Sequence, residues 1–446
     1  MWASRLLKGR NARSSTKQTA AALASMPTSQ TESSANSQAF SVAVAELMES
    51  LDFVLDQLDD QGEQGDLLRY HLSRIAKEIS RYENSRVRDE IAQEWSCDDD
   101  LIQLVLAACR CACSVYKAKT QPGDDLLPII SRTPSLTGTV KATSIWKMDN
   151  TKTLFVSIRG TASATDHMVN FNTDRKNAAS VFAFPGGFED IFAHSGFLAC
   201  ANTLLPWLRQ EIVRQVALDP TVDHVVFTGH SAGGAVAAIV FLHFVCHCPT
   251  ELSGAKFSLI TFGSPPVTSI NVTQMAQDLR QTKHILAVVN EYDLVSRIDQ
   301  SYLTSIIDLY RAAYDLPSVS TDVLTTNHSS QDAGRQWQLP YPDYHAVGEI
   351  VVMRARLDVG GTGLTGGSNL VTDKAPAQKL DMRQISPAEF SKLIFFEISV
   401  HKRRIYLERL EKMIQSRVQD SQTDGAAVEI AHLVRVEGED EVEETQ

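Results

Sequence analysis

The chain has 446 residues, a formal net charge of −12, and a composition of 43% hydrophobic and 22% charged residues. This length allows one large α/β domain with appendages, or two domains. The negative charge argues against nucleic acid as the main partner, because phosphate binding requires a concentrated basic face. No uninterrupted apolar run approaches the length that a membrane-spanning helix needs.

The first 38 residues are rich in Ser, Thr, Ala and Gln, and we expect residues 1–38 to be disordered. Five basic residues precede the first acidic residue, Glu32, which is also typical of a mitochondrial transit peptide. This segment has no apolar core of the length that a secretory signal needs. We therefore expect an intracellular protein, in the cytoplasm or at a membrane surface, with the mitochondrion as the alternative.

Helical spacing of apolar residues marks the next part of the chain. It predicts two amphipathic helices within residues 39–97, which form an N-terminal helical extension. A third helix is predicted from about Asp98 to Tyr116, because three successive aspartates suit a helix start. This helix opens the main domain, which we place at residues 98–418.

Beyond Gly123, short apolar runs alternate with helical segments. This order predicts an α/β fold, with a mostly parallel sheet flanked by helices, rather than an all-β barrel. Two stretches of the domain are expected to be insertions, 299–344 and 360–378, and residues 419–446 an acidic tail. The runs predicted as strands are Thr139–Trp146, Thr153–Ile158, His224–Thr228, Lys256–Phe262, His284–Asn290 and Glu349–Met353.

A lone serine stands where a buried strand turns into a small-residue helix. Ser231 lies between Gly229 and Gly233 in the pattern Gly-x-Ser-x-Gly, directly after the predicted strand His224–Thr228. Such a turn strains the serine backbone, so bulky side chains cannot stand two residues before or after it. The pattern therefore predicts that Ser231 is a nucleophile.

A serine hydroxyl is a weak nucleophile at neutral pH, so a histidine base and an orienting carboxylate must accompany Ser231. In this type of fold the acid and then the histidine follow the serine along the chain. Asp293 comes just past the end of the predicted strand His284–Asn290, which makes it the preferred acid. Glu291 and Asp299 are the substitutes.

The base is a choice among the histidines that follow Asp293. We prefer His401, which comes after the strand that we take as the last one, where the chain can fold back over the strand ends. His345 is the alternative, but it would enter that strand from the opposite end. His230 adjoins Ser231 but points in a different direction, and a structural role is predicted for it.

Acyl transfer also requires donors directed at the developing oxyanion. The backbone N–H of Ala232 supplies one, because it opens the helix after Ser231. Thr161, after the strand Thr153–Ile158, is the candidate for the second donor. No metal or organic cofactor is implied. The Cys-x-Cys sequence at 246–248, with His243 and His247, resembles metal-ligand spacing, but it lies in an apolar helical run typical of buried cysteines.

Several short motifs occur in order along the chain. They are IRGTASATD at 158–166, AHSGFL at 193–198, GHSAGG at 229–234, TFGSP at 261–265 and VVNEYDLV at 288–295. Together they resemble the class 3 lipases, a family of fungal-lipase-like α/β-hydrolases, and the resemblance covers about residues 100–415.

The resemblance implies a nucleophile at Ser231, an acid at Asp293, and an oxyanion hole formed by Thr161 and Ala232. The family's closing segment has a histidine with a tyrosine five residues later, which matches His401 and Tyr406 in ISVHKRRIY. Because a signal peptide and framework disulfides are missing, the chain is more similar to intracellular, diacylglycerol-lipase-like members than to secreted digestive lipases.

The activity implied is that of a serine carboxylic ester hydrolase that cleaves acyl esters of glycerolipids, with contact to a membrane or lipid-droplet surface. A non-catalytic lipase-like scaffold and an acyltransferase with the same triad are the alternatives. An aromatic-rich stretch around Pro185-Gly186-Gly187 is interpreted either as a movable apolar lid or as part of the core. Its candidate lid residues are Phe182, Phe184, Phe188 and Phe192.

Overall fold

The computed structural model describes residues 74–116, 128–134, 141–147, 151–160, 174–186, 190–313, 336–357 and 378–417. Several predictions lie outside these residues: the disordered segment 1–38, most of the helical extension, the acidic tail, Thr161 and Phe188.

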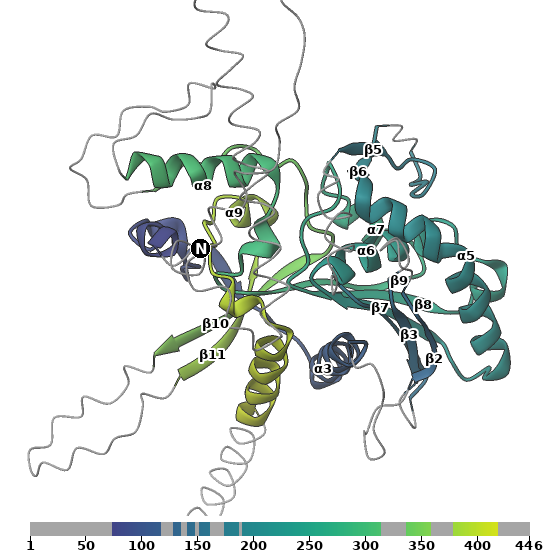
Figure 1. The fold of residues 1–446 in the computed structure, drawn as a ribbon. Helices are drawn as coiled ribbons and strands as arrows, with labels where there is room; N and C mark the ends of the chain where they lie inside the picture. Colours follow the sequence, from purple (N-terminus) through teal and green to yellow (C-terminus); the bar gives the residue numbers. More distant parts are fainter. Residues whose placement is uncertain are drawn as a thin grey trace, which may run out of the picture. The chain divides into compact units, whose positions relative to one another are not determined.

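Nine of the described strands form one sheet, in the order β1-β11-β10-β9-β8-β7-β4-β3-β2 (Figure 1). The five strands β4, β7, β8, β9 and β10 pair in parallel, and the pairs at both edges are antiparallel. The predicted α/β class is therefore confirmed, with a parallel centre and antiparallel margins. The strands are β1 (Ala92–Glu94), β2 (Pro128–Arg132), β3 (Thr143–Lys147), β4 (Thr153–Ile158), β5 (Arg175–Asn177), β6 (Phe192–His194), β7 (His224–His230), β8 (Lys256–Phe262), β9 (Thr282–Asn290), β10 (Glu349–Leu357) and β11 (Gln378–Ile385).

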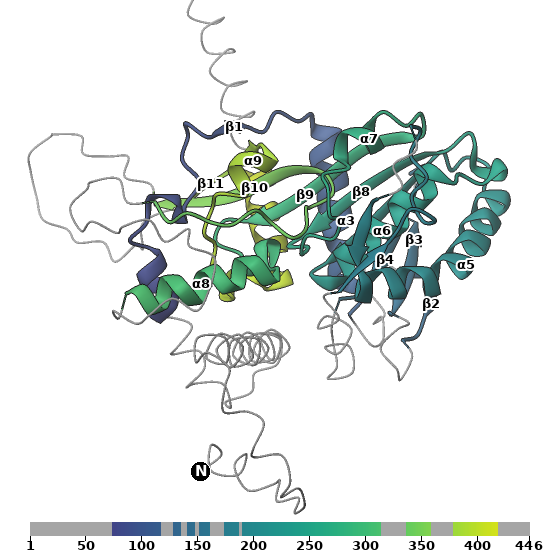
Figure 2. The same ribbon diagram turned by 90° about the horizontal axis from the view of Figure 1, so that it is seen from above.

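Helices cover both faces of this sheet (Figure 2). Alternate residues of β7 divide between two cores, as strand geometry requires. Val225 and Phe227 pack with α5 and α6, whereas Val226 packs with α3 and with the helix at residues 403–417. The helices are α3 (Asp99–Ser114), α5 (Ser195–Leu218), α6 (Ala232–Cys246), α7 (Thr273–Gln277), α8 (Gln300–Ala312) and α9 (Pro387–Phe390), with short 3₁₀ turns at η2 (Glu83–Ser85), η3 (Thr250–Leu252), η4 (Leu294–Arg297) and η5 (Ser399–His401).

The part of the chain before α3 is joined to the sheet, which the predicted boundary at residue 98 did not anticipate. β1 pairs with β11, and β11 in turn pairs with β10. The sequence had suggested that β10 is the last strand of the sheet, but β11 follows it. The residues before β1 are also attached. The Val87 N–H donates to Glu291 Oε1 at 2.7 Å, and Ile394 donates to the Asn84 carbonyl at 2.8 Å. We call residues 80–95 the N-terminal strap.

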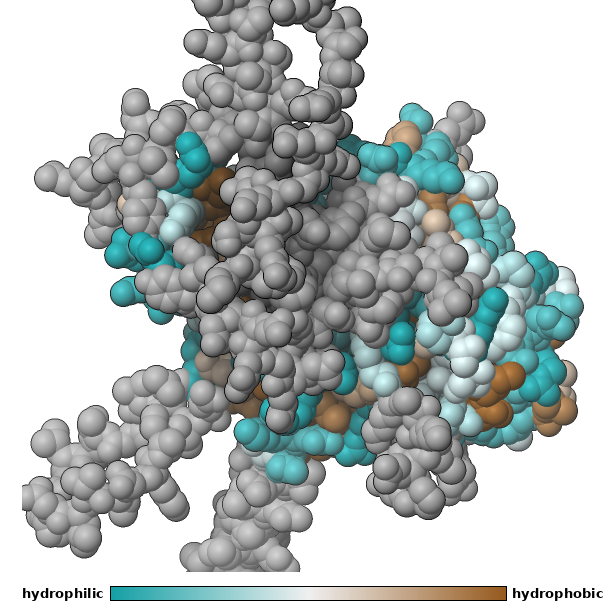
Figure 3. Space-filling model, in the orientation of Figure 1, coloured by the Kyte–Doolittle hydropathy of each residue, from teal (hydrophilic) through white to brown (hydrophobic). Residues whose placement is uncertain are grey.

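The described surface in Figure 3 interleaves hydrophilic and hydrophobic residues. Among the described residues, the large apolar side chains that are exposed are Ile129, Leu218, Ile270 and Tyr341. No helix in this part of the chain has both the length and the apolar character that crossing a bilayer demands.

Candidate active site

Ser231 occupies a sharp turn between β7 and α6. Its backbone angles are φ 57° and ψ −136°, a region that side-chain-bearing residues rarely adopt. The Ser231 N–H donates to the Phe262 carbonyl of β8 at 3.0 Å, which fixes the turn to the neighbouring strand. A strained serine held in this way is typical of a nucleophile elbow.

The glycines around Ser231 are required by close backbone contacts. A Cβ at Gly229 would lie 2.5 Å from the carbonyl carbon of Gly233, and a Cβ at Gly233 would overlap the Ile158 carbonyl oxygen of β4. The sequence argument that these two positions exclude side chains is therefore confirmed. The tight packing lets α6 begin directly beneath Ser231.

His401 and Asp293 are brought together although they are 108 positions apart in the sequence. The His401 Nδ1–H donates to Asp293, at 2.8 Å from Oδ2 and 3.1 Å from Oδ1. Because Nδ1 keeps its proton to donate this hydrogen bond to the carboxylate, the neutral ring carries its lone pair on Nε2. His401 Nε2 is buried and has no hydrogen-bond partner among the described residues. It is thus available to accept a proton.

A β-turn at the end of β9 presents Asp293. The Asp293 N–H donates to the Asn290 carbonyl at 3.0 Å, and Tyr292, at the third position of the turn, has φ 76°. The Asp293 side chain is fully buried and accepts two further hydrogen bonds, from the Val295 N–H at 2.9 Å and from the Tyr406 hydroxyl at 2.6 Å. These donors hold the carboxylate in a fixed orientation.

Tyr406 links this carboxylate to the backbone of β9. Its hydroxyl accepts the Asn290 N–H at 2.9 Å while it donates to Asp293. Burial, together with the Asp293 charge, raises the pKa of the Tyr406 phenol well above its usual value. The phenol therefore stays protonated and remains a donor to the carboxylate.

The His230 ring contacts both the backbone and the ring of His401. Its Nε2–H donates to the His401 carbonyl at 2.6 Å, and the two ring centroids are 4.5 Å apart. Burial lowers the pKa of His230 well below its usual value, so the ring stays neutral. These contacts agree with the structural role predicted for His230.

Gly263 makes room for the same group of side chains. It has φ +54°, and a Cβ there would lie 2.7 Å from Asp293 Oδ2, 2.8 Å from the Tyr406 hydroxyl oxygen and 3.0 Å from His401 Nδ1. Sequence reasoning quoted this glycine only as part of the TFGSP motif and gave it no role. Its importance depends on contacts between segments distant in sequence, which no local pattern records.

The two predicted oxyanion donors differ in what the structure describes. Ala232 is the first residue of α6, and the first N–H groups of a helix have no acceptor within the helix. Thr161 lies outside the described residues. The chain reaches that position from Gly160, whose N–H donates to the Tyr116 hydroxyl at 2.9 Å, and a Cβ at Gly160 would lie 2.8 Å from the His230 carbonyl oxygen.

The alternative acids and the alternative base have other partners. Glu291 forms an ion pair with Arg356, including a bond of 2.8 Å from Nη2 to Oε1, and Asp299 caps α8 by accepting the Tyr302 N–H at 2.7 Å. The backbone of His345 pairs with Thr268 in an isolated bridge. The acid that hydrogen-bonds to a candidate base is therefore Asp293, and its histidine partner is His401.

The lid interpretation is corrected for two of its four residues. Phe182 and Phe184 are 1% and 6% exposed and belong to the core formed with α5 and α6. The alternative reading, in which these side chains pack in the core, therefore applies to them. Phe192 is half-buried at the start of β6, and Phe188 lies outside the described residues.

The cysteines and histidines of the Cys-x-Cys region lie at the end of α6 and just beyond it. The His243 and His247 rings are 4.9 Å apart, and His243 Nδ1 lies 3.2 Å from the Val181 carbonyl oxygen. Among the described residues there is no group of three or more His, Cys, Asp or Glu that could hold a metal ion.

A strained serine between a buried parallel strand and a helix, with a buried carboxylate just past the end of β9 and a buried histidine in η5, defines an α/β-hydrolase fold. Residues 155–302, from β4 to the start of α8, match the family model described as "Lipase (class 3)". Over these residues the chain is similar to the class 3 lipases.

Known proteins resemble this chain over parts of its length. The secreted mono- and diacylglycerol lipase 1 of Fusarium solani is 30% identical over 116 residues, which are 26% of this chain and 31% of that protein. The chain thus matches less than a third of this curated relative. Among solved structures, a lipase from Rhizopus microsporus var. chinensis has 20% identity and a TM-score of 0.40, covering 49% of this chain and 74% of that one. A Rhizomucor miehei lipase propeptide complex has 14% identity and a TM-score of 0.42, covering 73% and 91%.

Proposed function

We propose that this chain hydrolyses carboxylic esters of glycerolipids through an acyl-enzyme formed on Ser231. The observation that carries the proposal is the buried pair of His401 and Asp293, in which Nε2 of the histidine is left unpartnered, together with the strained elbow at Ser231. The match of residues 155–302 to the class 3 lipase model supports ester hydrolysis as the reaction. The name of the Fusarium solani relative supports mono- and diacylglycerols as the substrate class.

In the proposed mechanism, Ser231 Oγ attacks the ester carbonyl carbon while His401 Nε2 takes the serine proton. Asp293 stabilises the imidazolium ion and keeps the proton on Nδ1. The N–H of Ala232 and a donor at Thr161 stabilise the oxyanion of the tetrahedral intermediate.

Collapse of the intermediate breaks the bond between the carbonyl carbon and the alcohol oxygen. His401 returns the proton to the leaving glycerol oxygen. A water molecule, deprotonated by His401, then attacks the acyl-enzyme carbonyl. The bond from the carbonyl carbon to Ser231 Oγ breaks, His401 returns the proton to Oγ, and the carboxylic acid leaves. Because the substrate is a lipid, we place this reaction at an intracellular membrane or lipid-droplet surface.

Labelling with a fluorophosphonate probe tests the nucleophile without a guess at the substrate. We expect one label per chain, located on Ser231 by peptide mass spectrometry, and no label on Ser231→Ala. Ser264→Ala is a matched control, since its hydroxyl lies near the elbow but donates to the Pro265 carbonyl. Label retained on Ser231→Ala, or lost from Ser264→Ala with the fold intact, would contradict the proposal.

Product analysis on mono-, di- and triacylglycerols, with and without a lipid interface, tests the substrate class. We expect a free fatty acid and a glycerol product with one acyl chain fewer. If the acyl group instead moves to an added alcohol even when water is in excess, the reaction is acyl transfer and hydrolysis is refuted.

A further inference from the structure

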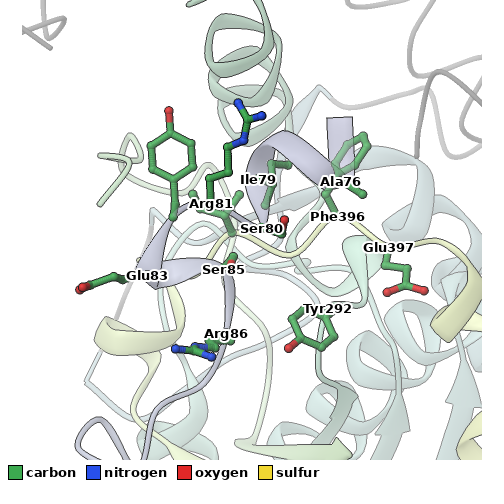
Figure 4. Close-up of a pocket in the computed structure, with 12 residues that line it drawn as sticks. Ala76, Ile79, Ser80, Arg81, Glu83, Ser85, Arg86, Tyr292, Phe396 and Glu397 are labelled. Carbon is green, nitrogen blue, oxygen red and sulfur yellow. The ribbon is translucent and has the colours of Figure 1, made fainter. Parts of the chain in front are cut away.

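A cavity of about 460 Å³ lies between the N-terminal strap and the segments that carry Asp293 and His401 (Figure 4). One wall comes from the helix at residues 74–79 and from strap residues up to Arg86, and the other from Tyr292 and residues 394–397. None of Ser231, Asp293 and His401 lines it. The cavity is therefore separate from the candidate active site, and its volume lies within the range of roughly 300–1,000 Å³ typical of small-molecule sites.

One part of the cavity wall is apolar, and the rest is polar or charged. Ile79, Ile394 and Phe396 line it, and all three belong to one buried core cluster. Ala76 also faces it from the helix at residues 74–79. Such a wall favours an aliphatic chain, because each methylene removed from water stabilises the complex by about 0.8 kcal/mol.

The charged residues that line the cavity differ in whether another side chain pairs with them. Glu83 lies 3.4 Å from Arg88, and the Glu397 carboxylate accepts a hydrogen bond from Ser399. Arg81 is paired with Glu78. Arg86 forms no ion pair with another described residue. A guanidinium group without a paired carboxylate favours an anionic ligand.

Tyr292 adds a donor close to Arg86. Burial and the nearby Glu291 carboxylate raise the pKa of the Tyr292 phenol, so the hydroxyl keeps its proton. Arg356 and then Arg86 are near enough to act in the opposite direction. The tyrosine also holds φ 76° at a turn position that usually takes glycine or asparagine. A large side chain kept at a strained position indicates that this side chain has a use there.

We propose that this cavity binds a single-chain anionic amphiphile, such as a fatty-acid carboxylate, at a site distinct from the catalytic serine. The carboxylate lies at Arg86 and the Tyr292 hydroxyl, and the alkyl chain lies against Ile79, Ile394 and Phe396. The proposal goes beyond ester hydrolysis and stands whether or not Ser231 reacts.

The position of the site connects it with the candidate catalytic residues. The Tyr292 carbonyl accepts the Glu397 N–H at 2.8 Å, and Asp293 and Glu397 form an isolated parallel bridge. A ligand against Tyr292 and Phe396 therefore packs on the backbone that carries the acid, a few residues from His401. Occupancy restrains the turn at Asp293.

Calorimetric titration of the full chain with dodecanoate, kept below its micelle concentration, tests the site. We use Ser231→Ala throughout, so that no covalent chemistry accompanies binding. Loss of a charge-assisted contact in Arg86→Gln should weaken binding about tenfold, and Ala76→Phe should abolish binding by filling the cavity. Lys77→Gln is the matched control, because this exposed cation is in the helix at residues 74–79 but does not line the cavity and forms no ion pair with another described residue, and it should bind as the parent does.

Dodecyltrimethylammonium, which has the same chain length and the opposite charge, should bind more weakly than dodecanoate. The proposal is overturned if Arg86→Gln and Ala76→Phe bind dodecanoate as the parent does, or if the cation binds as tightly as the carboxylate. Absence of fluorophosphonate labelling would contradict the proposed hydrolase and leave this binding result unaffected, so that the two failures are distinguishable.

Discussion

Replacement of Gly263 by alanine tests the packing around His401 and Asp293 in the most localised way. The new Cβ would lie 2.7 Å from Asp293 Oδ2, shorter than real Cβ contacts, and 3.0 Å from His401 Nδ1, tighter than most of them. Because φ is +54°, the alanine backbone would also be strained by about 1–2 kcal/mol. The carboxylate or the imidazole must move by several tenths of an ångström to remove the overlap.

We expect Gly263→Ala to lower the free energy of unfolding by about 1–3 kcal/mol and kcat by about 100-fold, because a small misplacement of catalytic groups is costly. The fall in kcat should exceed any change in KM, since Gly263 is argued to act on the triad and not on the substrate. Urea unfolding and initial rates on a short-chain aryl ester measure the two effects.

Gly254→Ala is the matched control, because a Cβ there meets no atom within 4 Å. We expect this variant to change the free energy of unfolding by less than about 0.5 kcal/mol. If Gly263→Ala retains the wild-type kcat, the inference that this glycine determines the geometry of the triad is wrong.

Two further substitutions probe the surroundings of the site. Tyr406→Phe removes the donor to Asp293 Oδ2 and the acceptor of the Asn290 N–H, both buried, so the free energy of unfolding should fall by about 1–3 kcal/mol and kcat should fall with it. Wild-type values in urea unfolding and in initial rates would refute this. Burial raises the pKa of Asp299 from 3.8 to about 6, so the folded state binds a proton more tightly than the unfolded state does. Stability should therefore fall as pH rises from about 4 to about 6, by at most about 3 kcal/mol. Asp299→Asn keeps an acceptor for the cap and should lose this dependence in urea unfolding at pH 4.5 and 7.5, whereas equal slopes in both proteins would contradict the argument.

The predictable part of the fold was its centre. Fully buried parallel strands such as β7 and β8 are continuous apolar runs, which the sequence displays directly. The margins gave weaker signals. β1 has three residues, too few for a period, and β11 reads QKLDMRQI, in which polar residues mask the alternation. The attachment of the strap through Val87 and Glu291 joins segments 204 positions apart and leaves no local pattern.

The candidate site was predictable to a different degree at each residue. Ser231 stands in a turn whose glycines are forced by contacts with α6 and with β4, but both glycines lie two residues from the serine, so a short pattern identifies it. Apart from the family's histidine and tyrosine spacing, His401 could be selected only by its order in the chain, since its partner Asp293 is distant in sequence. Phe182 and Phe184 were ambiguous, because an aromatic residue beside a Pro-Gly turn has the same sequence signal in a lid and in a core.

The proposed function depends most directly on which histidine activates Ser231. Initial rates on a short-chain aryl ester, measured for His401→Ala and His345→Ala, separate the two candidates. We predict that His401→Ala lowers kcat by at least about 1,000-fold with the fold retained, and that kcat of His345→Ala stays close to the wild-type value. Loss of activity in His345→Ala with full activity in His401→Ala would contradict it.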